Sequence, residues 1–123
     1  MSVPVELADL REETTRFGPT PYLLTVGADG RPHAVSVQVG WQDDVLVAWA
    51  GRRSVANASE RPEVTLLWSP VEAGGYSLIL DGSATAAEGR VSVRPGRAIL
   101  HRSAATGPGD PAASECVPLP LDT

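Results

Sequence analysis

The sequence predicts a mainly β protein, an antiparallel barrel accompanied by short helices. Three observations support this expectation. Five or six segments have the composition of β-strands, the pair Asp29-Gly30 joins the first two of them, and a long later strand contains Gly82, where it can bend. Antiparallel strands of which one is strongly bent favour a closed or partly closed barrel over a flat sheet.

The first predicted element is a helix over residues 5–17. Pro4 suits the first turn of a helix, and Gly18 is placed to end it. Two prolines follow and force an extended backbone into a strand over residues 22–28, which is rich in β-branched and aromatic side chains.

A hairpin is expected next, because Asp29-Gly30 stands between two strand-like runs and suits a tight turn whose two central residues have positive φ. The return strand covers residues 32–41, and its side chains alternate between an apolar face and a small, polar face. The apolar face has His33, Val35, Val37, Val39 and Trp41, and the other has Ala34, Ser36, Gln38 and Gly40.

A third strand, residues 45–50, follows a turn and ends before Gly51. The next residues predict a short helix over 54–60, with Ser54 as its N-cap and Pro62 just beyond its end. This helix is an insertion between strands.

The second half of the chain predicts strands over residues 64–68, 76–86 and 90–93. Pro95-Gly96 then favours a break, followed by a short helix over residues 97–102. The expected organisation is one barrel domain, residues 1–103, and a tail, residues 104–123, that is rich in Pro, Gly and Ala and lacks regular structure.

Composition excludes several classes of protein. The chain has 123 residues, a net charge of −5 and a pI of about 4.9, so a polyanionic nucleic acid would be repelled. No apolar run approaches the ~20 residues that span a bilayer. The single cysteine, Cys116, and an acidic N-terminus without a signal-peptide pattern favour the cytoplasm. All ten basic residues are arginine, which excludes a lysine Schiff base.

Metal binding and several common enzyme motifs are also excluded. His33, His101 and Cys116 are the only soft metal ligands, and no two of them have ligand spacing. The sequence has no nucleophile elbow, no P-loop and no dinucleotide-binding glycine motif.

One segment does predict chemistry, the run GRRSVAN at residues 51–57. It places two arginines and a hydroxyl where a strand ends and a helix begins. Unpaired helix N–H groups, the positive end of the helix dipole and guanidinium groups together favour a small anion. The alternative is a solvated turn with an ordinary N-cap.

The order of these pieces resembles that of the pyridoxamine 5′-phosphate oxidase-like split β-barrel family. The likeness covers about residues 5–102 and depends on spacing and order. It is carried by YLLTVGADGRPH (22–33), RSVANASERP (53–62), VTLLW (64–68), the Asp81-Gly82 pair and RAILHR (97–102).

The resemblance implies a six-stranded antiparallel split β-barrel and a homodimer with FMN, or the deazaflavin F420, in a groove between subunits. Trp41 and Val39 are candidates for an apolar outer surface in such a dimer. Ten residues would contact the cofactor: His33, Val35, Ser36 and Val37 beside the ring, Trp49 and Ala50 near the ribityl chain, and Arg52, Arg53, Ser54 and Asn57 at the phosphate.

Two departures from the family shape the expected function. Many flavin-binding members have a lysine at the position of Ser54, so Arg53 would supply the charge here. The chain also lacks the longer C-terminal substrate region of true pyridoxamine phosphate oxidases. The expectation is therefore an FMN- or F420-dependent oxidoreductase acting on a small organic molecule. The alternative is a non-catalytic cofactor-binding or storage protein, or a member that has lost the cofactor.

Overall fold

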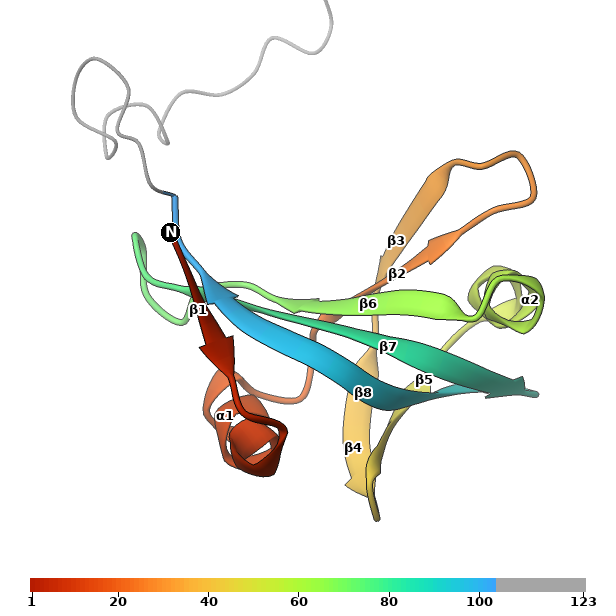
Figure 1. The fold of residues 1–123 in the computed structure, drawn as a ribbon. Helices are drawn as coiled ribbons and strands as arrows, with labels where there is room; N and C mark the ends of the chain where they lie inside the picture. Colours follow the sequence, from red (N-terminus) through yellow and green to blue (C-terminus); the bar gives the residue numbers. More distant parts are fainter. Residues whose placement is uncertain (104–123) are drawn as a thin grey trace, which may run out of the picture.

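A computed structural model describes residues 1–103, which form one antiparallel sheet of eight strands with two α-helices and one 3-10 helix (Figure 1). The predicted fold class is confirmed, with two strands more than expected. The elements are β1 (Ser2–Val5), η1 (Leu7–Asp9), α1 (Leu10–Phe17), β2 (Tyr22–Val26), β3 (Pro32–Ser36), β4 (Gln38–Gln42), β5 (Val45–Trp49), α2 (Arg52–Glu60), β6 (Glu63–Trp68), β7 (Ser77–Ala87) and β8 (Arg90–His101).

The sheet curls into a barrel that stays open along one seam. Its strand order is β3-β2-β6-β7-β8-β5-β4, and β1 pairs with the far half of β8. The two end strands, β3 and β4, follow each other in the chain with only Val37 between them. Figure 1 shows the two hairpins, β2–β3 and β4–β5, projecting from opposite sides of the long β6–β7–β8 strands. This is a split barrel.

The bend at Gly82 is confirmed. Pairing between β7 and β8 passes from Asp81↔Arg97 to Gly82↔Pro95, so Gly96 has no partner and forms a bulge. A Cβ atom on Gly82 would lie 2.5 Å from the Arg94 carbonyl oxygen, which explains why only glycine fits there. The bulge bends the longest pair of strands, so that β8 pairs with β5 at one end and with β1 at the other.

The core lies inside the curled sheet and beneath α1. Trp68 is 2% exposed, and its indole N–H donates to the Gly18 carbonyl at 2.7 Å, which fixes the end of α1 against β6. The core side chains are Leu10, Leu23, Val37, Leu46, Ala48, Ala58, Val64, Leu66, Trp68, Leu78, Leu80, Val91, Val93 and Ala98.

The predicted N-terminal helix over residues 5–17 is wrong in its first half. Residues Ser2–Val5 are strand β1, paired with the end of β8, and α1 begins only at Leu10. Pro4 is compatible with either structure, because an edge strand tolerates a residue without an N–H group. Tertiary pairing therefore decided the conformation.

The predicted C-terminal helix over residues 97–102 is also wrong. β8 continues through the Gly96 bulge to His101 and is hydrogen-bonded to β7 on one side and β1 on the other. Pro95-Gly96, which favoured a break, instead marks the irregularity within one long strand.

The predicted return strand over residues 32–41 is interrupted at Val37. Its alternation between covered and exposed side chains is confirmed up to Val39 and fails at Gly40, which is half-buried like Val39 and Trp41. The hairpin is confirmed too, but its turn differs, since among the turn residues only Gly30 has positive φ. The expected tail, residues 104–123, lies outside the described residues. No helix within residues 1–103 has the length and apolarity needed to cross a membrane.

Trp41 and Val39 do not form an outer surface. Both pack against the core, and the Trp41 indole N–H donates to Thr14 Oγ1 at 2.8 Å. Arg11 lies over the Trp41 ring at 4.9 Å from its centroid. Through these contacts with Thr14 and Arg11, Trp41 joins β4 to α1.

Candidate functional site

A hollow of about 300 Å³ opens where the ends of β3 and β5 meet the start of α2; we call it the strand hollow. It includes residues from three elements that the barrel topology brings together at its seam. Nine of the ten predicted residues line it: His33, Val35, Ser36, Val37, Trp49, Ala50, Arg52, Arg53 and Ser54. Gly51 completes the lining.

The wall of the strand hollow is apolar on one side. Val37 is buried and Val35 is half-buried, while Trp49 is 56% exposed. A Cβ atom on Gly40 would lie 3.7 Å from the Trp49 ring, so this ring packs over the bare backbone of β4. Trp49 thus presents a large aromatic surface to solvent beside the hollow.

The start of α2 lies at the polar side of the same hollow. Gly51 is the N-cap, in an extended conformation with φ −81° and ψ 179°, and no side chain caps the helix. The predicted N-cap, Ser54, is instead inside the first turn and is 2% exposed. The first helical bond runs from the Val55 N–H to the Gly51 carbonyl, so the N–H groups of residues 52–54 have no acceptor within the helix.

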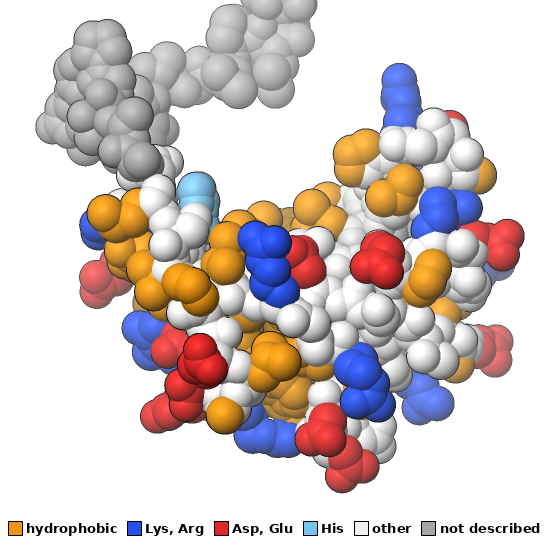
Figure 2. Space-filling view, viewed as in Figure 1, with side chains coloured by type: hydrophobic (Ala, Val, Ile, Leu, Met, Phe, Trp, Pro, Cys, Tyr) orange, Lys and Arg blue, Asp and Glu red, His pale blue; other side chains and the backbone are white. Residues whose placement is uncertain are grey.

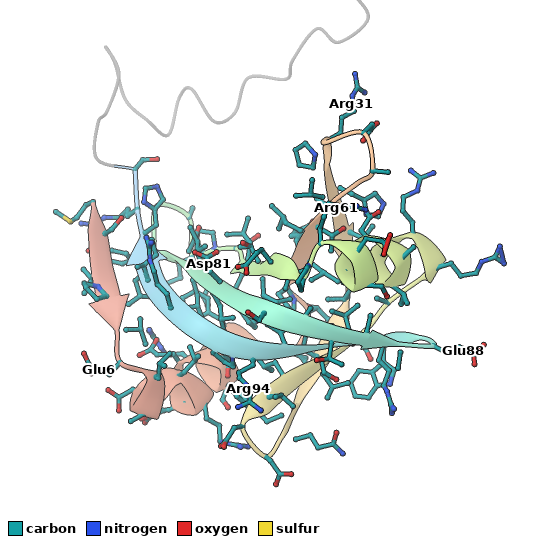
Figure 3. All side chains as sticks on the ribbon, turned by 45° about the vertical axis from the view of Figure 1, so that its right-hand side comes forward. Glu6, Arg31, Arg61, Asp81, Glu88 and Arg94 are labelled. Carbon is teal, nitrogen blue, oxygen red and sulfur yellow. The ribbon has the colours of Figure 1, made fainter. Side chains whose placement is uncertain are left out.

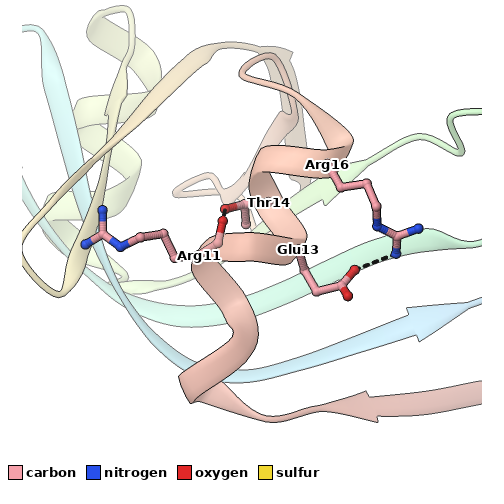
Figure 4. A network of polar contacts seen from close by, with 4 residues as sticks. All are labelled: Arg11, Glu13, Thr14 and Arg16. Atoms are coloured by element: carbon pink, nitrogen blue, oxygen red, sulfur yellow. Dashed lines mark hydrogen bonds and ion pairs between the residues drawn. The ribbon is translucent and has the colours of Figure 1, made fainter.

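The two arginines of α2 have no carboxylate partner within residues 1–103. The one ion pair within residues 1–103 joins Arg16 and Glu13 on α1, with 2.6 Å between Arg16 Nη2 and Glu13 Oε1 (Figure 4). Arg52 and Arg53 are both exposed, and their guanidinium groups add to the positive end of the α2 dipole. This combination of donors favours an anion.

A second hollow, of about 570 Å³, lies beside the first, between the β2–β3 turn and α2; we call it the hairpin hollow. His33 and Arg53 line both hollows. The other lining residues are Gly27, Ala28, Asp29, Arg31, Pro32 and Asn57. The tenth predicted residue, Asn57, therefore lies in the hairpin hollow rather than in the strand hollow.

Asn57 is tied to the neighbouring strand. It is 6% exposed, and its Nδ2 donates to Thr25 Oγ1 at 3.1 Å. Arg61, at the end of α2, donates from Nε to the Val26 carbonyl at 2.7 Å. These two bonds hold α2 against β2, so the distance between the helix and the hairpin is set by the fold itself.

His33 has an unusual environment at the junction of the two hollows. The residue is half-buried, but its Nδ1 atom is buried and has no hydrogen-bond partner among the described residues. A buried polar atom without a partner is destabilising, so a ligand or an ordered water that bonds to this atom would remove that cost. Across residues 1–103 there is no group of three His, Cys, Asp or Glu side chains that could hold a metal.

Sequence reasoning missed the hairpin hollow. Gly27 is part of a predicted strand and Asp29 of a predicted turn, with no site role for either, and nothing in the local sequence links Thr25 to Asn57. The one sequence signal for the hairpin hollow was the Asp29-Gly30 turn, because Asp29 and its neighbours lie next to α2 once the strands pair.

No family model matches the sequence. Two curated relatives do, the uncharacterized proteins Mb0449c of Mycobacterium bovis and MT0457 of Mycobacterium tuberculosis. Each is 40% identical over 114 residues, covering 79% of this chain and 79% of the relative.

Three solved structures share the fold. An F420 reductase superposes with a TM-score of 0.55 at 17% identity, over 65% of this chain and 88% of that one. The heme storage protein HutZ of Vibrio cholerae gives 0.59 at 13% identity, over 80% and 96%. A candidate pyridoxamine 5′-phosphate oxidase of Listeria innocua gives 0.56 at 16% identity, over 79% and 94%. The chain belongs to one family with the two mycobacterial proteins, and its fold is that of the pyridoxamine 5′-phosphate oxidase-like split β-barrels.

Proposed function

We propose that this protein is a cytoplasmic oxidoreductase that binds a flavin-type cofactor, FMN or the deazaflavin F420, in the strand hollow and acts on a small organic molecule. The observation that carries the proposal is the meeting, around one hollow, of an apolar wall, a helix N-terminus without a side-chain cap and two arginines that have no ion-pair partner within residues 1–103. The fold likeness to an F420 reductase and to a candidate pyridoxamine 5′-phosphate oxidase supports it.

The residues fit the parts of such a cofactor. A phosphate needs donors and positive charge, which the N–H groups of residues 52–54 and the guanidinium groups of Arg52 and Arg53 supply. A flat ring needs apolar surface with a few polar groups at its edge. Val35, Val37 and Trp49 supply the apolar surface. The polar group at the edge is Nδ1 of His33, which has no hydrogen-bond partner within residues 1–103.

A bound flavin or deazaflavin supplies hydride transfer, so the chain itself needs no covalent catalyst. The roles left to the protein are positioning and desolvation. Arg52, Arg53 and the start of α2 hold the anionic end, which fixes the orientation of the ligand. The apolar wall excludes water from one side of the hollow.

We further propose a homodimer. A row of apolar side chains, Tyr22, Leu67, Ile79 and Ile99, crosses β2, β6, β7 and β8 on the face opposite the core. Tyr22 is 45% exposed and the other three are half-buried. Figure 2 shows hydrophobic side chains gathered in the hollowed upper side of the molecule, between the N-terminus and the β2–β3 hairpin. A second copy is the occupant that this surface and the adjoining open strand hollow favour.

A protein that holds a cofactor without turnover is the second candidate. The observation that favours it is the fold likeness to HutZ, a heme storage protein. Among residues 1–103, no carboxylate lines the strand hollow. Binding and turnover therefore need separate measurements.

Two assays test the proposal. Purified full-length protein is titrated with FMN and with F420, following tryptophan fluorescence and cofactor absorbance; we expect saturable binding of one of them at micromolar concentration or below. Reoxidation of the reduced complex by small acceptors such as quinones is then timed. Faster reoxidation than in free solution supports an oxidoreductase, and tight binding without acceleration supports the holding protein. Indifference to both cofactors overturns the proposal.

A further inference from the structure

We infer that a pocket beside α1 binds a small zwitterion that carries an apolar or aromatic group, the chemical class of the apolar α-amino acids. We call it the α1 pocket; it lies between α1, the β4–β5 turn and the bulge of β8. Within residues 1–103 it shares no lining residue with the strand hollow or the hairpin hollow. Its ligand is therefore separate from the proposed cofactor.

The α1 pocket has a volume of about 430 Å³, which lies in the range of small-molecule sites, about 300–1,000 Å³. Its walls come from η1, the start of α1, the β4–β5 hairpin and β8. These segments meet because β8 pairs with β5 and β5 pairs with β4. The pocket is thus a product of the barrel topology rather than of one local turn.

The floor of the α1 pocket is apolar. Leu10 is 1% exposed, and Trp41 and Pro95 are half-buried. On the rim, Leu7 is 52% exposed. Figure 2 shows hydrophobic side chains gathered low in the view, between α1 and the lower end of β4, with Lys/Arg and Asp/Glu side chains around them. A ligand with an apolar or aromatic group would remove this surface from water.

Charges of both signs border this floor. Arg94, from β8, lies between α1 and the β4–β5 hairpin (Figure 3). Asp43 and Asp44 form the turn of that hairpin. All three residues are exposed, and none has an ion-pair partner within residues 1–103. A ligand with a single charge would be attracted by one side of the rim and repelled by the other, whereas a zwitterion can be attracted by both.

Arg11 holds the walls of the α1 pocket together. Its guanidinium group lies over the Trp41 ring, 4.9 Å from the centroid, and its Nη2 donates to the Asp43 carbonyl at 2.6 Å. Asp43 has a φ of 54°, a left-handed conformation that is uncommon outside glycine, and this bond helps to hold it. The Trp41 indole N–H donates to Thr14 Oγ1 at 2.8 Å. The pocket is therefore preformed, which lowers the entropic cost of binding.

Four small molecules separate the features that the α1 pocket would recognise. Phenylalanine has the ring and both charges. Phenylpropionate lacks the ammonium group, phenylethylamine lacks the carboxylate, and glycine lacks the ring. A comparison of their Kd values therefore shows whether the apolar floor and both signs of charge are used at once.

Binding is followed by heteronuclear NMR of isotope-labelled full-length protein. The indole N–H signal of Trp41 is assigned through its contact with Thr14, and that of Trp49, in the strand hollow, is the internal control. We expect phenylalanine to shift the Trp41 signal saturably, while the Trp49 signal stays in place. Loss of either charged group from the ligand should raise Kd about two- to fivefold, the range for exposed ion pairs, and glycine should cause no shift.

Three variants test the assigned contacts. Arg94→Gln should remove the advantage of phenylalanine over phenylethylamine, and the double variant Asp43→Asn, Asp44→Asn should remove its advantage over phenylpropionate. Ala8→Phe, on the exposed side of the pocket, should abolish binding of every compound. Arg97→Gln is the matched charge control, because Arg97 is an exposed arginine of β8 that does not line the pocket.

The inference is overturned if phenylalanine causes no saturable shift of the Trp41 signal, or if phenylpropionate or phenylethylamine binds as tightly as phenylalanine. Equal effects of Arg94→Gln and Arg97→Gln would also overturn it, because only long-range electrostatics would then act on the ligand. No cofactor is added in these titrations, so their result is independent of the proposed function.

Discussion

The side chains of Asn57 and Thr25 form a buried hydrogen bond, 3.1 Å from Nδ2 to Oγ1, that joins helix α2 to strand β2 beneath the hairpin hollow. The two residues are 6% and 1% exposed. They are 32 positions apart in the sequence, and their contact fixes the helix that begins at the candidate anion site. The bond therefore links the stability of the fold to the geometry of the site.

The first prediction concerns this bond. Thr25→Val keeps the shape of the side chain but leaves Asn57 Nδ2 without its acceptor, so the free energy of unfolding should fall by about 1–3 kcal/mol. Urea denaturation of Thr25→Val, Asn57→Leu and the double variant measures the coupling. We expect the double variant to be less destabilised than the sum of the single ones; strict additivity would contradict a direct interaction.

The second prediction compares two glycines at the β7–β8 bulge. Gly82→Ala places a methyl group 2.5 Å from the Arg94 carbonyl oxygen and 2.7 Å from Val93 Cγ1, so the strands must move apart. We expect a loss of about 3 kcal/mol in the free energy of unfolding. For Gly96→Ala the nearest atom, the Asp81 carbonyl oxygen, is 3.6 Å away, and the loss should stay below about 1 kcal/mol. Similar midpoints for both variants in thermal denaturation would refute the steric argument.

Local sequence was sufficient where short-range chemistry decides the structure. The Asp29-Gly30 hairpin, the alternation from His33 to Val39 and the bend at Gly82 follow from turn preference, pleating and the absence of a side chain, respectively. Local sequence was insufficient where pairing with a distant strand decides the conformation of a segment. Ser2–Val5 is a strand only because the end of β8 is there to pair with it.

The candidate site also has one part that could be predicted from the sequence and one part that could not. A helix N-terminus beside two arginines could be found in the GRRSVAN run, and the family resemblance supplied the strand residues that meet it. The hairpin hollow could not be found, because it forms only when the turn after β2 packs beside α2. The partners Thr25 for Asn57 and Val26 for Arg61 belong to a strand that precedes the helix by more than 20 residues.

The third prediction tests the proposed dimer. Ile79→Glu places a charge in the middle of the apolar row formed by Tyr22, Leu67, Ile79 and Ile99, and burying it in an interface would leave it unpaired. Light scattering at micromolar concentration should give a dimeric mass for the unmodified protein and a monomeric mass for Ile79→Glu.

Leu7→Glu is the matched control for the dimer. Leu7 is an apolar residue that is 52% exposed, but it lies in η1, away from the row. The control should remain dimeric. A monomeric mass for the unmodified protein, or equal dissociation of both variants, would rule out this surface as the interface.

The last prediction separates the two arginines at opposite ends of α2. Arg53 lines both hollows from the first turn of the helix and has no ion-pair partner within residues 1–103. Arg61 follows the last turn, and its Nε is already bonded to the Val26 carbonyl. Arg53→Ala should therefore raise the Kd for the cofactor about 10- to 150-fold, the loss of a charge-assisted bond of about 1.5–3 kcal/mol, with little change in stability.

Arg61→Ala should have the opposite profile, a free energy of unfolding lower by about 1 kcal/mol and a Kd raised by much less, because the bond it loses holds the helix rather than the ligand. Fluorescence titration and urea denaturation of the same two preparations give both quantities. Equal shifts in Kd would mean that only long-range electrostatics is at work and that the anion does not bind at the start of α2. If Arg52→Ala alone weakens binding, the neighbouring guanidinium holds the anion instead. If none of the three substitutions matters while cofactor still binds, the uncapped N–H groups and Ser54 are sufficient, and the arginines are solvated.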